Sequence, residues 1–129
     1  MRELMTSLLL WINAHGFPAC VGLPEVNLVQ SEQTHGYVAW YQSGVINLSE
    51  RFDYDGLLLV GGGQRSTLAR SALLHELVHF CQAQREGPLH RYSESAWNER
   101  EDQAYKVQTL FLREQGSSTV LMWRKDREG

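Results

Sequence analysis

One short stretch restricts the fold of this chain more than any other part of it. Residues 73–82 read LLHELVHFCQ, and they place two histidines and one glutamate among apolar side chains. A helix built from these residues is apolar over nearly all of its surface, which is typical of a helix buried in the core. Ionisable side chains on a buried helix need compensating partners, because an unpaired buried charge is very costly. The rest of the chain must therefore supply those partners.

The spacing of the three polar residues indicates what the partner is. His75 and His79 are four residues apart, so in a helix they lie on one face and can reach a single ion. Glu76 projects about 100° away from His75, which places it beside such an ion, where a base accepts a proton from metal-bound water. The motif is expected by chance only roughly 0.02 times at this histidine and glutamate content. It therefore favours a metal site over a core helix whose histidines bond to the backbone and whose glutamate meets an arginine.

A catalytic zinc ion commonly has three protein ligands, so a third ligand must come from elsewhere in the chain. The candidates that follow the motif are His90, Glu94, Glu99, Glu101 and Asp102. On a helical wheel, Glu101 lies at the centre of the inward face. The residues within about 80° of it are Trp97, Ala104, Tyr105, Gln108, Phe111 and Leu112.

The wheel separates Glu101 from its acidic neighbours. Glu99 and Asp102 project among polar or charged side chains such as Lys106, so we expect both carboxylates in solvent. Glu101 points into the core and is the predicted third ligand. The alternative for Glu101 is a buried salt bridge with Arg70 or Arg91.

These two helical segments together resemble a known family. HELVH on one helix and EDQAY, a Glu-x-x-Ala pattern, on the next are similar to the gluzincin clan of zinc metallopeptidases, and most similar to its minimal single-domain members. The resemblance covers about residues 44–112 and implies a zincin-like fold. It also implies that His75, His79 and Glu101 bind Zn²⁺ and that Glu76 is the general base. The chain lacks the extra subdomains with which larger peptidases of the clan close over their substrates.

The implied function is a zinc-dependent peptidase that hydrolyses peptide bonds with a metal-activated water. We expect a peptide or protein substrate, lying as an added strand along the edge formed by residues 36–42 or 44–50. The oxyanion needs a second stabiliser besides zinc, and His90, Tyr92 and Tyr105 are all candidates. The alternative function is a catalytically weak zinc-binding domain that acts as a structural or protein-interaction module.

The remaining elements predict an α+β fold formed by a single domain over residues 1–129. Apolar residues at helical spacing near the start indicate an amphipathic helix rather than a secretory signal, namely Leu4, Met5, Leu8, Leu9, Trp11 and Ile12. The active-site helix is expected to begin at Ser66 or Thr67 and to end at about Gln84, before Gly87. The helix that bears Glu101 is expected from Ser93 to about Gln115, where Gly116 stops it.

Between the first helix and the active-site helix we predict a small antiparallel β-meander. Its strands are short runs rich in β-branched and aromatic residues, at 25–33, 36–42 and 44–50. Ser43-Gly44 is a two-residue hairpin signal. The apolar residues 57–60 form either a further strand or a buried loop.

Composition excludes several other functions. A net charge of −3 provides no concentrated cationic face for nucleic acid, and no apolar run approaches the ~20 residues that span a membrane. Two cysteines are too few for a disulfide framework, which favours a cytoplasmic over a secreted location. Cys81 projects away from the two histidines, so we expect a buried thiol or a disulfide with Cys20. We expect a monomer whose last residues, 118–129, either cover the cleft or pack on the core.

Overall fold

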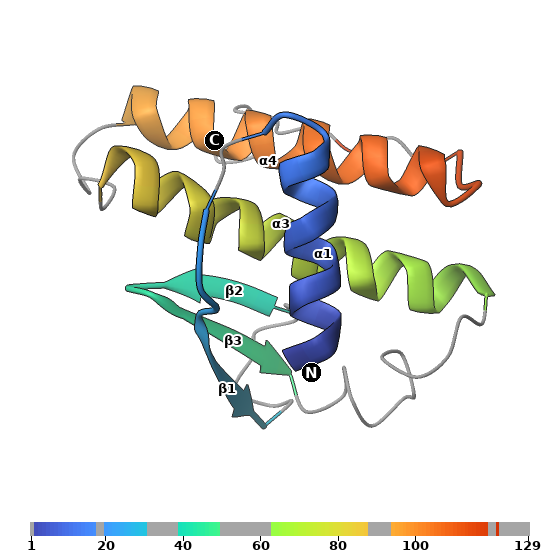
Figure 1. The fold of residues 1–129 in the computed structure, drawn as a ribbon, viewed down its shortest axis with the longest axis horizontal. Helices are drawn as coiled ribbons and strands as arrows, with labels where there is room; N and C mark the ends of the chain where they lie inside the picture. Colours follow the sequence, from blue (N-terminus) through green and yellow to red (C-terminus); the bar gives the residue numbers. More distant parts are fainter. Residues whose placement is uncertain are drawn as a thin grey trace.

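The structure is a computed structural model that describes residues 2–17, 20–30, 39–49, 63–87, 94–118 and 121. Within these residues the fold is α+β, with three helices and one three-stranded sheet (Figure 1). The helices are α1 (Arg2–Ala14), α3 (Gly63–Glu86) and α4 (Glu94–Glu114). The strands are β1 (Glu25–Val29), β2 (Ala39–Gln42) and β3 (Val45–Ser49). None of the described helices is long and apolar enough to cross a membrane.

The predicted amphipathic helix at the start of the chain is confirmed as α1. Its buried residues are Met5, Leu8, Leu9 and Ile12. This spacing follows one face of a 3.6-residue helix, so a single stripe of α1 faces the core. The helix ends where the backbone N–H of His15 bonds to the carbonyl of Trp11 and Gly16 adopts a φ of 74°. Glycine suits this position because it has no Cβ to oppose a left-handed conformation.

The hairpin prediction is confirmed, but the prediction of an antiparallel meander is wrong. Ser43 and Gly44 have φ values of 51° and 86°, as a type I′ turn requires, and β2 pairs antiparallel with β3. However, β1 pairs with the other edge of β3 and runs parallel to it, so the sheet is mixed, with the order β1-β3-β2. The two-residue turn holds β2 on one edge of β3, which leaves the opposite edge for β1. The apolar strand β3 is then central, with Ile46 and Leu48 fully buried.

The two long helices end within two residues of the predicted positions, but α3 begins earlier than expected. It starts at Gly63 rather than at Ser66 or Thr67, because a residue that caps well at a helix start is also tolerated inside a helix. Gly87 ends α3 with a φ of 85° and an N–H bond of 2.9 Å to the carbonyl of Ala83. Gly116 ends α4 in the same left-handed conformation, with a φ of 87°. The predicted range of 93–115 for α4 is thus correct to one residue at each end.

Helix α3 occupies the centre of the molecule. It packs against α4, α1 and β2, and Figure 1 shows it between α4 and the sheet, with α1 crossing both long helices. Its apolar residues confirm the predicted burial, because Leu73, Leu74, Leu77 and Val78 are all fully buried. The polar side chains that lie among these apolar residues, Ser71, His75 and Gln82, are buried as well.

Two further contacts hold segments near the two ends of the chain, one against α3 and one against α4. Cys20 and Cys81 form a disulfide that joins the segment after α1 to α3, which confirms one of the two states expected for Cys81. The hydroxyl of Thr109 on α4 bonds to both the backbone N–H and the carbonyl of Leu121, at 2.9 and 3.0 Å. Leu121 is therefore fixed against α4. Most of residues 118–129 lie outside the described ranges, as do residues 57–60, Arg91, His90 and Tyr92.

Candidate metal centre

Two histidines of α3 and one glutamate of α4 converge at the contact between these helices. One ligand atom from each of His75, His79 and Glu101 lies within 4.8 Å of the others. The Nε2 atoms of His75 and His79 are 3.2 Å apart, and His75 Nε2 is 3.4 Å from Glu101 Oε1. His79 Nε2 contacts the same carboxylate oxygen. His75 and Glu101 are only 5% and 7% exposed, so the structure brings together the three residues that the sequence predicts as ligands.

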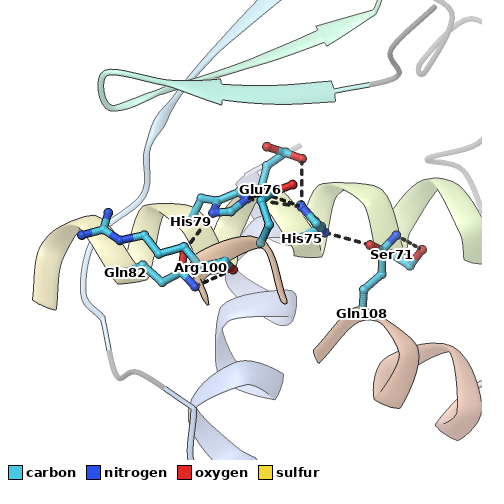
Figure 2. Close-up of polar contacts among 8 residues, drawn as sticks. Ser71, His75, Glu76, His79, Gln82, Arg100 and Gln108 are labelled. Atoms are coloured by element: carbon cyan, nitrogen blue, oxygen red, sulfur yellow. Dashed lines mark hydrogen bonds and ion pairs between the residues drawn. The ribbon is translucent and has the colours of Figure 1, made fainter. Parts of the chain in front are cut away.

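A glutamine on α4 determines which nitrogen of His75 carries the proton. His75 Nδ1 lies 2.9 Å from Gln108 Oε1. The amide nitrogen of Gln108 donates to Ser71 Oγ at 3.0 Å (Figure 2), and the Ser71 hydroxyl donates to the carbonyl of Leu68 at 2.7 Å. Because Gln108 Oε1 can only accept, Nδ1 of His75 must donate. Its Nε2 lone pair is therefore free to face Glu101.

A second glutamine does the same for His79. His79 Nδ1 lies 2.8 Å from Gln82 Oε1, and the amide nitrogen of Gln82 donates to the carbonyl of Arg100 at 3.0 Å (Figure 2). The same nitrogen donates to Gln103 Oε1 at 2.8 Å. A backbone carbonyl can only accept, which fixes the orientation of this amide. His79 Nδ1 therefore also donates, and its Nε2 atom points at the same centre as that of His75.

This arrangement fits a metal ion. Two Nε2 lone pairs and a carboxylate oxygen face one another at this site, where they repel unless a proton or a metal ion lies between them. Metal bonds of about 2.0–2.1 Å in a tetrahedral zinc site place ligand atoms about 3.4 Å apart. The 3.2 Å and 3.4 Å separations measured from His75 Nε2 agree with that spacing. Two histidines and a glutamate are also the donor set of a known type of catalytic zinc site.

Glu76 lies beside the three candidate ligands without being one of them. Its Oε2 atom is 4.0 Å from His75 Nε2, and Figure 2 shows its carboxylate on the side of α3 that faces the β2–β3 hairpin. The backbone N–H of Tyr41 in β2 donates a hydrogen bond to this carboxylate. Burial raises the pKa of Glu76, while the nearby charges of His75 and His79 oppose that rise. The net result is a carboxylate that is more basic than usual.

The pKa values of Glu101 and His79 move in opposite directions. Burial tends to raise the pKa of Glu101, but hydrogen bonds and charge from the two histidines outweigh burial and lower this pKa to about 2. Burial tends to lower the pKa of His79, but Glu101 and Glu76 raise it overall. The site therefore keeps a negative charge on Glu101 and attracts positive charge between the helices.

The other predicted residues lie where the helical wheel places them, with one exception. Glu99 is exposed, and Asp102 pairs on the surface with Lys106 at 2.9 Å. The ring of Tyr105 packs against the His75 ring, with centroids 4.4 Å apart. Trp97, which the wheel places on the inward face, is instead 43% exposed. Its ring is parallel to that of His79, at a centroid distance of 6.4 Å, so it borders the site rather than filling the core.

Sequence reasoning assigned no role to Gln82, Gln108 or Ser71. The available signal was the presence of polar side chains at buried positions of helices, because Gln108 lies on the predicted inward face and Gln82 follows His79 by three residues. A buried amide must be hydrogen-bonded. A buried amide near a metal-binding histidine is therefore a candidate partner for its second nitrogen.

Comparison with known proteins places the chain in one family. Residues 1–125 match a family described as a domain of unknown function (DUF6647), and the chain belongs to this family. No curated protein and no solved structure matches the chain. Because the family description names no activity, the site itself is the basis for a functional proposal.

Proposed function

We propose that this domain is a zinc-dependent peptidase with a zincin-like, gluzincin-type centre. His75, His79 and Glu101 hold the metal, and Glu76 is the general base. The observation that supports this most strongly is the position of Glu76, whose carboxylate is only partly exposed and lies 4.0 Å from His75 Nε2, outside the three converging ligand atoms. When bound, zinc supplies a water of lowered pKa and polarises the carbonyl that is attacked.

The environment of Glu76 suits a group that takes and returns a proton. General bases are most effective when their pKa lies near the working pH, and burial raises the pKa of Glu76 in that direction. The N–H of Tyr41 holds the carboxylate at the edge of the site. In the proposed reaction Glu76 accepts a proton from the attacking water and passes it to the departing amine.

Strand β2 offers a place for an extended peptide. Among the described residues, the sheet order leaves β2 at an edge, and this strand packs against α3. Tyr41 is opposite Ile46, one residue beyond the pair that flanks the two-residue turn, so its backbone groups point away from β3. The N–H of Tyr41 is taken by Glu76, so a peptide that pairs with the remaining backbone groups of this edge would pass beside Glu76. This geometry supports a peptide substrate over a small soluble one.

The alternative is a catalytically weak zinc-binding domain in which the metal only stabilises the fold. The burial of His75 and Glu101 favours it, because structural zinc sites are enclosed. The ligand set favours catalysis, since structural sites have four protein ligands and three converge within the described residues.

Hydrolysis of a peptide library by the wild type and by Glu76→Gln distinguishes the two functions. We expect Glu76→Gln to bind one zinc per chain and to lose at least about 100-fold in cleavage rate, because general acid-base catalysis contributes about 10²–10⁴-fold. Glu99→Gln, an exposed position on α4, is the matched control and should retain both zinc and activity. Undiminished cleavage by Glu76→Gln would contradict the peptidase mechanism. Zinc binding without cleavage by the wild type would support the structural alternative.

A further inference from the structure

The two metal-binding histidines are held by amides rather than by carboxylates, and the two amides are fixed in different ways. On the basis of the proposed zinc site, we propose that Gln108 and Gln82 are positioning residues that set the histidine tautomers. We further propose that the Gln108 position accepts a carboxylate partner, whereas the Gln82 position does not. The difference arises from the group that accepts a hydrogen bond from each amide nitrogen. For Gln108 it is the rotatable hydroxyl of Ser71, and for Gln82 it is the backbone carbonyl of Arg100.

The orientation of Gln108 depends on Ser71. The Ser71 hydroxyl donates to the carbonyl of Leu68 at 2.7 Å, so its oxygen accepts from the amide nitrogen of Gln108 at 3.0 Å. The amide oxygen then faces His75 Nδ1 at 2.9 Å and requires a proton there. A reversed amide would present its N–H₂ group to Nδ1. The ring proton would then move to Nε2 and block the ligand atom.

The orientation of Gln82 depends on the backbone of α4. Its side chain is fully buried, and its amide nitrogen donates to the carbonyl of Arg100 and to Gln103 Oε1. Gln103 can rotate its amide to become a donor, but the carbonyl of Arg100 cannot. This contact therefore holds the acceptor end of Gln82 against His79 with no alternative arrangement.

The same difference determines what a carboxylate would do at each position. In Gln108→Glu the new oxygen would face Ser71, whose hydroxyl can turn from Leu68 and donate to it. A carboxylate that accepts from Nδ1 makes the histidine a more basic ligand, so zinc should bind more tightly. In Gln82→Glu the new oxygen would face the carbonyl of Arg100 with no proton between them. Zinc should then bind more weakly, because the carbonyl of Arg100 cannot turn away as the Ser71 hydroxyl can, and it repels the buried carboxylate even when Gln103 donates to it.

Zinc affinity, measured by competition with a chromophoric chelator at pH 8, tests the proposal on the purified full chain. We expect Gln108→Glu to bind about 10-fold more tightly and Gln108→Met about 10- to 100-fold more weakly, the usual range for a lost histidine partner. Ser71→Ala should weaken binding, because the Gln108 amide loses what orients it. Val107→Ala, a buried position next to Gln108, is the matched control and should lower stability without changing affinity.

The histidine tautomers provide a second readout that needs neither zinc nor substrate. Long-range ¹H–¹⁵N correlation spectra of the metal-free protein at pH 9 should show His75 protonated at Nδ1, and Ser71→Ala should shift it toward protonation at Nε2. A purely structural role predicts weaker zinc binding for every substitution and no tautomer change. Equal weakening by Gln108→Glu and Gln108→Met, or an Nε2 proton on wild-type His75, would overturn the proposal. If Gln82→Glu does not fold, the Gln108 and Ser71 variants decide the question, whether or not the domain proves to be a peptidase.

Discussion

At the scale of single residues, the site depends on a charge that α4 places inside the core. Glu101 is 7% exposed, yet its pKa is lowered to about 2 because the histidines stabilise its ionised form more than burial opposes it. Asp102, the next residue, carries the same charge on the surface and pairs only weakly with Lys106, since exposed ion pairs contribute about 0–1 kcal/mol. Neighbouring carboxylates on one helix therefore have entirely different roles.

This contrast predicts the effects of two matched substitutions. Glu101→Gln keeps the size of the side chain but removes the charged ligand, so zinc should bind more than about 100-fold more weakly, a larger loss than removal of a ligand's hydrogen-bond partner causes. Asp102→Asn should leave zinc affinity unchanged. Competition titrations with a chelator measure both values. A similar affinity for the two variants would show that Glu101 is not a ligand.

At the scale of elements, the ends of α1 and α4 are joined through one carboxylate. Glu114 accepts from the indole N–H of Trp11 at 3.3 Å and pairs with His15 Nε2 at 2.6 Å. The His15 ring stacks on that of Trp11, and its Nδ1 lies 2.7 Å from the Trp11 carbonyl. This backbone bond raises the pKa of His15 above 6.5, and Glu114 raises it further, although burial opposes both.

The contact should therefore stabilise the fold in a pH-dependent way. Because folding raises the pKa of His15, the charged form of this histidine stabilises the fold fully below pH 6.5. This stabilisation is lost as the pH rises through the pKa that His15 has in the folded state. Glu114→Gln should lower the melting temperature more at pH 6 than at pH 9, while the exposed Glu99→Gln should show little difference between the two. Thermal unfolding followed by circular dichroism at both pH values provides the comparison. An equal loss at pH 6 and pH 9 would mean that the charge on His15 contributes nothing.

At the scale of the whole molecule, α3 is the element to which the other parts are attached. The proposed zinc joins it to α4, and the disulfide from Cys81 joins it to Cys20, 61 residues earlier in the chain. Closing a loop of that length stabilises a fold by about 4 kcal/mol in the chain-entropy description.

The sequence was sufficient where local periodicity determines structure. The apolar stripe of α1 and the apolar surface of α3 follow from residue spacing alone, and the same reasoning placed Glu101 inward and Glu99 outward. The pairing of β1 with β3 could not be predicted, because it depends on which strand edge remains open after the hairpin forms. The roles of Gln82 and Gln108 depend on how α3 packs against α4, since a glutamine is compatible with solvent as readily as with a buried hydrogen bond.

Anomalous X-ray scattering shows whether α3 and α4 together bind one zinc ion. Diffraction data from crystals of the zinc-loaded protein, collected on either side of the zinc absorption edge, locate the metal without assumptions about its ligands. The account predicts one anomalous peak per chain, within about 2.0–2.2 Å of His75 Nε2, His79 Nε2 and a carboxylate oxygen of Glu101. The absence of a peak at this position, or zinc bound elsewhere in the chain, would contradict it.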